Sequence, residues 1–263
     1  MKPVRTVAAI ALLIVTCVAR AAPLVASPTL ADVIAGPQRT PAFEARDRYR
    51  HPLAALEFFG LKPDMKVVEI WPSGGWWTEI LAPYLHAHGK YYAAVQPPLR
   101  DAAFKEKLAE APQYYDRVII TEAGPPDHWR LAPPGSVDMV LTFRNVHNWL
   151  AGGYEKQMFA AMYRALKPGG VLGLEEHRAA AGTTRADWVK TGYVSEDFVI
   201  RLAREAGFRL VAKSEISANP KDTKNYPDGV WTLPPTLQLG QKDRAKYLAI
   251  GESDRMTLKF VKP

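Results

Sequence analysis

Val67-Val68-Glu69-Ile70-Trp71-Pro72-Ser73-Gly74-Gly75 decides the fold of this chain. Lys66 to Trp71 is a short, mostly apolar run, which is typical of a buried strand, and the Pro72–Gly75 turn ends it. Five apolar residues then recur at the spacing of one helix face: Trp77, Ile80, Leu81, Tyr84 and Leu85. The stretch therefore predicts a strand, a glycine-containing turn and a helix that Pro83 bends or shortens.

Strands and helices continue to alternate on the C-terminal side of this unit. The further runs expected to form strands are Tyr91–Val95, Arg117–Thr121, Val137–Phe143, Val171–Leu174, Phe208–Ala212 and Met256–Val261. Helices are expected at Pro52–Phe59, at Asp101–Ala109, at Met158–Leu166 before a Lys167–Gly170 turn, and between the cap Ser195 and Gly207. This alternation predicts an α/β fold with a mostly parallel sheet and helices on both faces.

Composition excludes several classes of protein. Of 263 residues, 48% are hydrophobic and 23% are charged, which fits a globular domain and neither a disordered chain nor a polytopic membrane protein. The 22 prolines are scattered, which argues against a helical bundle. The net charge of +7 includes three basic residues near the N-terminus, and the remainder is too dispersed to indicate nucleic-acid binding.

The N-terminal residues 1–21 have the layout of a secretory signal peptide. Met1–Arg5 is basic, and Val7–Ala19 is apolar and shorter than a bilayer span. Cleavage is expected after Ala21, with Ala22 as the alternative. A lipoprotein anchored at Cys17 is the less favoured alternative. We therefore expect a periplasmic or secreted protein with no stable membrane span after cleavage, and without Cys17 it has no thiol for a disulfide or a metal.

Two irregular segments flank or interrupt the expected domain. Residues 22–42 have the composition of a linker or arm, and residues 43–263 are assigned to the α/β domain. Residues 213–255 form a long proline-containing insertion, which is a lid, a binding loop or a disordered segment.

In an open α/β sheet, ligands bind at the carboxyl ends of the strands. The residues at these ends are Glu69–Trp77, Gln96, Glu122–Trp129, Arg144–Trp149 and Glu175–Arg178.

The order of elements resembles the class I S-adenosylmethionine-dependent methyltransferases over roughly Leu53 to Val261. The quoted Val67–Gly75 stretch occupies the place of the family's acidic, glycine-rich first motif, and Leu166–Gly170 is similar to its turn before the fifth strand. The chain also resembles a group of exported proteins described as predicted methyltransferases, in which tryptophan and proline enter the first motif. The resemblance implies a Rossmann-like, seven-stranded sheet with an antiparallel last strand, and S-adenosylmethionine bound across the first strands.

The glycine motif departs from that family at defined positions. Its three glycine places hold Trp71, Ser73 and Gly75, with Gly74 beside them. The indoles here can face the cofactor's sulfonium by a cation–π contact, or they can belong to the core. Gln96 stands where the family has an acid for the ribose hydroxyls.

Glu69 and three residues beyond the glycine motif complete the expected site. Glu69 is the candidate ligand for the cofactor's amino group, and its structural role would be to bond the backbone of the glycine turn; the two roles are compatible. Arg144–Trp149 resembles the Leu-His-Asn-Trp stretch of plant-type small-molecule O-methyltransferases, although the acidic residue that usually follows is absent. His147, at this strand end, is a candidate general base, and Asn145 is a further candidate for binding the cofactor. His177 is the competing base. Either histidine can instead hydrogen-bond a loop.

No metal site is expected from the sequence. His86-Ala87-His88 resembles half of one, but no matching carboxylate cluster follows. No Gly-x-Ser-x-Gly elbow and no P-loop occurs, so hydrolases and nucleoside triphosphatases are not indicated.

The favoured hypothesis is an exported methyltransferase acting on a small molecule. The alternative is a non-catalytic periplasmic binding protein with the same fold, which the altered glycine motif and the destination outside the cytoplasm favour. A scaffold protein has only the basic charge and the N-terminal arm in its favour.

Overall fold

The computed structural model describes residues 28–97 and 102–263. The expected signal peptide, residues 1–21 with Cys17, lies outside these residues. Among the residues described, no helix is both long and apolar enough to cross a bilayer.

The described residues form one seven-stranded sheet in the order β3-β2-β1-β4-β5-β7-β6. The strands are β1 (Lys66–Ile70), β2 (Lys90–Val95), β3 (Ile119–Glu122), β4 (Val137–Phe143), β5 (Leu166–His177), β6 (Arg209–Ser214) and β7 (Arg255–Val261). Neighbouring strands are parallel except that β7 runs antiparallel to β5 and β6. This confirms the expected α/β class, with its seven strands and antiparallel last strand.

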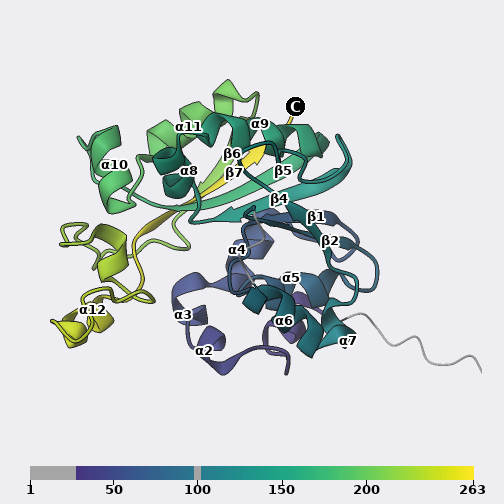
Figure 1. The fold of residues 1–263 in the computed structure, drawn as a ribbon, viewed down its shortest axis with the longest axis horizontal. Helices are drawn as coiled ribbons and strands as arrows, with labels where there is room; N and C mark the ends of the chain where they lie inside the picture. The colour runs from purple at the N-terminus through teal and green to yellow at the C-terminus, as the bar shows by residue number, and fades with distance from the viewer. Residues whose placement is uncertain (1–27, 98–101) are drawn as a thin grey trace, which may run out of the picture.

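Helices cover both faces of the sheet (Figure 1). They are α1 (Leu30–Ile34), α2 (Pro41–Glu44), α3 (Asp47–Arg50), α4 (Pro52–Phe59), α5 (Thr78–Leu85), α6 (Ala102–Glu110), α7 (Pro112–Tyr115), α8 (Val146–Gly152), α9 (Glu155–Ala165), α10 (Arg185–Thr191), α11 (Glu196–Glu205), α12 (Arg244–Ile250) and the 3-10 turn η1 (Gly229–Thr232).

The alternation of side chains along the strands divides the core into two layers. Val68 and Val140 pack with α8, α9 and α11, whereas Val67 and Met139 pack on the opposite face with α1, α4 and α5. Figure 1 shows the same division, with α8–α11 above the sheet and α4–α7 below it. Because the central strands are buried on both faces, they are apolar almost throughout, as expected of a parallel sheet.

Three strands differ from their expected bounds by two residues or more at one or both ends. β3 begins at Ile119 rather than Arg117, β6 ends at Ser214 rather than Ala212, and β5 extends from Leu166 to His177 rather than from Val171 to Leu174. The Lys167–Gly170 segment stays in the ladder because Gly169 donates to the carbonyl of Lys262, and Lys262 donates to that of Gly170. At the other end of β5, His177 pairs with Arg255, so the carboxyl end of this strand includes His177.

Pro83 lies inside α5 without ending it, since the helix continues to Leu85. Proline cannot donate to the carbonyl four residues earlier, which belongs to Glu79. The side-chain amide of Gln38 donates to that carbonyl instead, at 3.1 Å. The N-terminal arm thus supplies the hydrogen bond that Pro83 cannot make.

The two irregular segments have more structure than their composition predicts. Residues 28–42, part of the expected linker, include α1 and the start of α2, and Thr40 donates its backbone N–H to the buried carboxylate of Glu79 at 2.9 Å. The 213–255 insertion contains η1 and α12 and is tied down by a hydrogen bond of 2.9 Å from the Tyr193 hydroxyl to Asp222.

Candidate functional site

A cavity of about 140 Å³ lies where the strand order reverses, between β1 and β4. This reversal is the point at which open α/β sheets bind their ligands. The cavity is lined by Phe43, Arg46, Arg50, Glu69, Ile70, Trp71, Pro72, Ser73, Gly74, Trp76, Trp77, Phe143 and Arg144. Four of the expected cofactor residues therefore meet here: Glu69, Trp71, Ser73 and Gly74.

The loop from Trp71 to Gly75 keeps the backbone of a glycine motif although two of its places have other residues. The φ angles are 51° at Trp71, 50° at Ser73 and 83° at Gly75. A left-handed conformation costs a non-glycine residue about 1–2 kcal/mol, so this chain maintains strain at two positions of the loop. Strain of this kind clusters at functional sites.

The Trp71 side chain lies across the carboxyl ends of the first strands. Its Nε1 donates to the carbonyl of Ala123, which follows β3, at 2.7 Å. Because β2 separates β1 from β3, the indole passes over the end of β2. Its ring also contacts Trp149 and Tyr154, with centroids 6.1 and 6.5 Å away. Trp71 thus covers the place where the family resemblance puts the nucleoside of the cofactor.

Trp76 and Trp77 are part of the core, which is the structural role that the sequence analysis gave as the alternative to a cation–π contact with the cofactor. Both are 4% exposed. Trp76 donates its Nε1 to the carbonyl of Phe43 at 2.9 Å, and Trp77 stacks on Phe143 with centroids 4.0 Å apart. Their rings form one wall of the cavity.

Glu69 is buried at the end of β1 beside two hydroxyl groups. Its Oε2 accepts hydrogen bonds from Tyr91 and from Thr78. Burial raises the pKa of Glu69 to about 7, against the opposing effect of these two hydrogen bonds. Among the described residues, Glu69 forms no hydrogen bond with the Trp71–Gly75 turn, so the expected structural role is wrong. Its carboxylate belongs instead to a buried network with the hydroxyl groups of Tyr91 and Thr78.

Three expected cofactor residues do not line the cavity. Asn145 is buried and donates to the carbonyl of Ile70 at 2.9 Å, which braces the end of β1. Gln96 is exposed just after β2, and Gly75 is buried inside the turn.

The two candidate bases lie together at the ends of β4 and β5. The rings of His147 and His177 are 5.2 Å apart, and both side chains are at least nine-tenths buried. His147 Nδ1 lies 2.9 Å from Glu176 Oε1, and His177 Nδ1 lies 2.5 Å from the hydroxyl of Ser253. Burial, with the neighbouring cationic groups, lowers the pKa of His177 well below its usual value. Neither histidine is among the residues that line the cavity.

His147, Glu176 and His177 also offer ligand atoms within 4.8 Å of one another, which is a possible metal group that the sequence analysis missed. The Glu176 oxygens already accept backbone N–H groups from Val146 at 2.6 Å and from His177 at 2.8 Å. A metal would have to replace part of this bonding, so the geometry fits a carboxylate that orients His147 better than a carboxylate that binds metal.

Four arginines surround the carboxylate of Glu252 beside the cavity, and the sequence analysis did not find this cluster. They are Arg46, Arg50, Arg144 and Arg255, which lie within 4.0 Å of its oxygens. Arg46 and Arg50 are 206 and 202 residues from Glu252 in the sequence, so no local motif marks the cluster.

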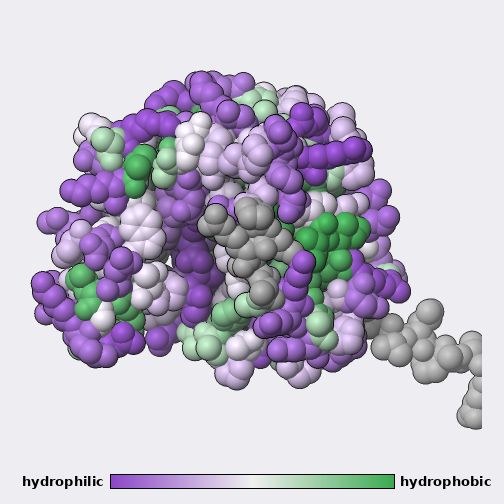
Figure 2. All heavy atoms as spheres, in the orientation of Figure 1, coloured by the Kyte–Doolittle hydropathy of each residue, from purple (hydrophilic) through white to green (hydrophobic). Residues whose placement is uncertain are grey.

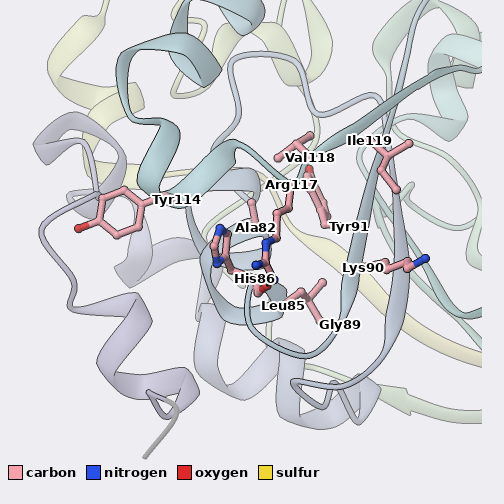
Figure 3. A pocket seen from close by; sticks show the side chains of 10 residues that line it. All are labelled: Ala82, Leu85, His86, Gly89, Lys90, Tyr91, Tyr114, Arg117, Val118 and Ile119. Atoms are coloured by element: carbon pink, nitrogen blue, oxygen red, sulfur yellow. Dashed lines mark hydrogen bonds between the residues drawn. The ribbon is translucent and has the colours of Figure 1, made fainter. Parts of the chain in front are cut away.

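A second cavity, of about 210 Å³, lies at the opposite edge of the sheet, near the amino ends of β2 and β3 (Figure 3). His86 is part of its wall and hydrogen-bonds Asp116 at 2.7 Å. This edge is not where α/β sheets place their ligands, and we assign it no function.

Comparison with solved structures establishes the fold. A methyltransferase from Aquifex aeolicus, described as S-adenosylmethionine-dependent, aligns with a TM-score of 0.57 and 16% identity over 89% of this chain and 99% of its own. A Haemonchus contortus N-methyltransferase, solved with phosphomonomethylethanolamine and S-adenosylhomocysteine, aligns with a TM-score of 0.57 and 17% identity over 90% of this chain and 61% of its own.

The same fold is shared by a protein named for different chemistry. The [4+2]-cyclase SpnF aligns with a TM-score of 0.57 and 15% identity over 89% of this chain and 91% of its own. The sequence matches no protein-family model and no curated protein. The chain therefore has the class I methyltransferase, Rossmann-like α/β fold, and its activity has to be argued from its site.

Proposed function

We propose that the protein is an S-adenosylmethionine-dependent methyltransferase that acts on a small molecule. The observation that carries this proposal is the loop from Trp71 to Gly75, which maintains strained, glycine-like φ angles beside a cavity at the point where the strand order reverses. A chain that had lost its ligand would gain stability by relaxing this loop, so the retained strain favours a bound group that needs the backbone in this form.

The residues present can hold the amino-acid end of the cofactor as they stand, but its nucleoside end requires a side chain to move. Glu69 and the Ser73–Gly74 backbone would hold its amino-acid end within the existing cavity. At about 140 Å³ the cavity is smaller than the ~300 Å³ or more of ordinary small-molecule sites, so the nucleoside requires Trp71 to leave Ala123. When bound, the cofactor would supply an activated methyl group.

The protein's part in catalysis is then alignment of the acceptor and removal of its proton. Glu176 accepts the Nδ1 hydrogen of His147, which leaves the lone pair on Nε2. An acceptor lying between the cavity and α8 would give its proton to that nitrogen, and the Glu176 carboxylate would stabilise the imidazolium that forms. His177, held neutral by burial, would help to exclude water from the side of the site that His147 occupies.

The Haemonchus contortus neighbour was solved with a small phosphorylated amine, and this favours a small, charged acceptor for the present chain as well. The charge of the cavity wall agrees with such an acceptor, because three of the lining residues are arginines: Arg46, Arg50 and Arg144.

A non-catalytic binding protein is the second candidate, and one observation favours it. Trp71 fills the path toward β2 and β3 and is hydrogen-bonded there, so a ligand smaller than the cofactor fits the existing cavity without rearrangement. For either function we propose an exported protein, as the sequence of residues 1–21 indicates. N-terminal sequencing of the protein from fractionated cells tests the location: cleavage after Ala21 supports export, and an uncleaved cytoplasmic chain contradicts it.

Calorimetric titration of the purified protein with S-adenosylhomocysteine separates the two functions. A methyltransferase is expected to bind it and to gain thermal stability in its presence. If millimolar ligand gave neither heat nor stabilisation, the enzymatic proposal would be withdrawn in favour of the binding protein.

A further inference from the structure

The arginine cluster links the helix α3 and its N-cap to the start of β7. Arg46 Nε lies 2.7 Å from Glu252 Oε1, Arg50 Nε lies 3.3 Å from Oε2, and Arg255 Nη1 lies 3.0 Å from the same oxygen. Arg144, just after β4, is 4.0 Å from it. These side chains bring positive charge from three separate parts of the chain to one place at the carboxyl edge of the sheet.

The positive charge of this cluster is not balanced by its acids. Glu252 is one carboxylate among four guanidinium groups, and it is held ionised because those groups lower its pKa. Glu175 is a further acid that interacts with Arg50, Arg144 and Arg255, and burial raises its pKa. A buried excess of cations is costly unless an anion accompanies it.

Several donors of the cluster have no partner. The Nη2 atoms of Arg46 and Arg50 and the Nε of Arg255 are buried and form no hydrogen bond among the residues that the structure describes. Arg50 is 2% exposed, and its guanidinium lies over the Trp76 ring at 4.7 Å. Such groups are normally satisfied, and an unpaired charged donor costs more than a neutral one.

Two of the three side chains with unpaired donors, Arg46 and Arg50, line the cavity between β1 and β4. Arg144 lines the same cavity. The planar guanidinium fork matches the paired oxygens of a carboxylate or a phosphate. The indoles of Trp76 and Trp77 also line the cavity, and they suit a short apolar portion of the same molecule.

We infer that this cavity is a binding site for an anionic group, a carboxylate or phosphate on a small molecule, held by Arg46, Arg50 and Arg144. This deepens the proposed function without depending on it, because a binding protein would use the site in the same way. The anion has two possible sources: the carboxylate of the cofactor's amino-acid end, or an acidic group on the acceptor.

The test uses the full mature protein and two variants with partly exposed arginines, Arg46→Gln and Arg144→Gln, which remove charge with little loss of packing. Arg48→Gln is the matched control, because Arg48 lies in the same helix as Arg50 but is exposed and does not line the cavity. Each protein is titrated in an anion-poor buffer with inorganic phosphate, with S-adenosylhomocysteine and with 5′-methylthioadenosine, which lacks the amino-acid end.

Phosphate is expected to bind the wild type and Arg48→Gln with equal affinity. Its affinity for Arg46→Gln and for Arg144→Gln should be lower by about tenfold or more. If both cavity variants also weaken S-adenosylhomocysteine but not 5′-methylthioadenosine, the cofactor carboxylate is the anion. If phosphate still binds protein that is saturated with S-adenosylhomocysteine, the anionic group that the site binds belongs to the acceptor. Both results support the anion site.

The anion site is overturned if phosphate does not bind the wild type and neither cavity variant changes the affinity for S-adenosylhomocysteine. It is also overturned if Arg48→Gln loses as much affinity as Arg46→Gln, because the effect would then be one of general charge. Phosphate binding without any S-adenosylhomocysteine binding would support the anion site while removing the methyltransferase proposal, so the two can fail separately.

Discussion

Replacement of Trp71 by glycine should open the nucleoside part of the site. In the present structure the indole is held by the 2.7 Å hydrogen bond to Ala123 and by ring contacts with Trp149 and Tyr154. A hydrogen bond contributes about 1 kcal/mol and each aromatic contact about 0.5–1.5 kcal/mol, so moving the side chain costs about 2–4 kcal/mol. Trp71→Gly removes that cost, and S-adenosylhomocysteine should bind it about 30- to 1000-fold more tightly than the wild type.

The same variant should be less stable without unfolding. Truncation of a packed aromatic side chain costs about 3–5 kcal/mol, while glycine relieves about 1–2 kcal/mol of strain at the φ of 51°. Calorimetric titration measures the affinity, and urea unfolding measures the stability. Trp129→Ala is the control, since Trp129 also contacts Tyr154 but lies outside the loop. An affinity of Trp71→Gly equal to or below that of the wild type would refute the reasoning, because the indole would then be a contact rather than an obstacle.

Three further predictions concern charged groups. Because burial raises the pKa of Glu69 from 4.5 to about 7, the folded protein holds a proton that the unfolded chain has released, and its free energy of unfolding should fall by about 3 kcal/mol from pH 4.5 to 7. Glu69→Gln should remove this fall, measured by urea unfolding across that range; an unchanged pH profile would contradict the assignment. Glu252→Gln should lower stability by about 3–5 kcal/mol, since it leaves four arginines without their shared carboxylate, and a loss below 1 kcal/mol by the same method would count against the cluster. His147→Ala should reduce turnover of an identified acceptor by about 10²–10⁴-fold while leaving the affinity for S-adenosylhomocysteine unchanged, and full turnover would exclude His147 as the base.

Most of the sheet could be predicted because local signals agree with it. Val137–Phe143 has the expected bounds since the run is apolar and is buried on both faces. The Lys167–Gly170 segment could not be predicted as part of a strand, because its ladder partner is Lys262, far away in the sequence. Composition suggested a linker before Phe43, whereas the bonds from Thr40 and Gln38 to Glu79 hold that arm against α5.

The candidate site was predictable in position and less so in its contents. The carboxyl-end rule located Glu69, Trp71 and Arg144 correctly around one cavity. It could not show that the Trp71 indole crosses to Ala123, since the choice of rotamer depends on a partner 52 residues away. Nor could it find the pairing of Arg46 with Glu252, which joins residues 206 apart.

The position of β7 has a consequence for the biosynthesis of the protein. This strand is among the last elements of the chain, yet it lies between β5 and β6 and completes the ladder on both sides. Until the ribosome has released it, β5 carries an unpaired, aggregation-prone border, and such long-range pairing forms slowly. A nascent chain that lacks β7 would therefore keep that border of β5 open, and the two halves of the sheet on either side of β7 would join only after β7 is made.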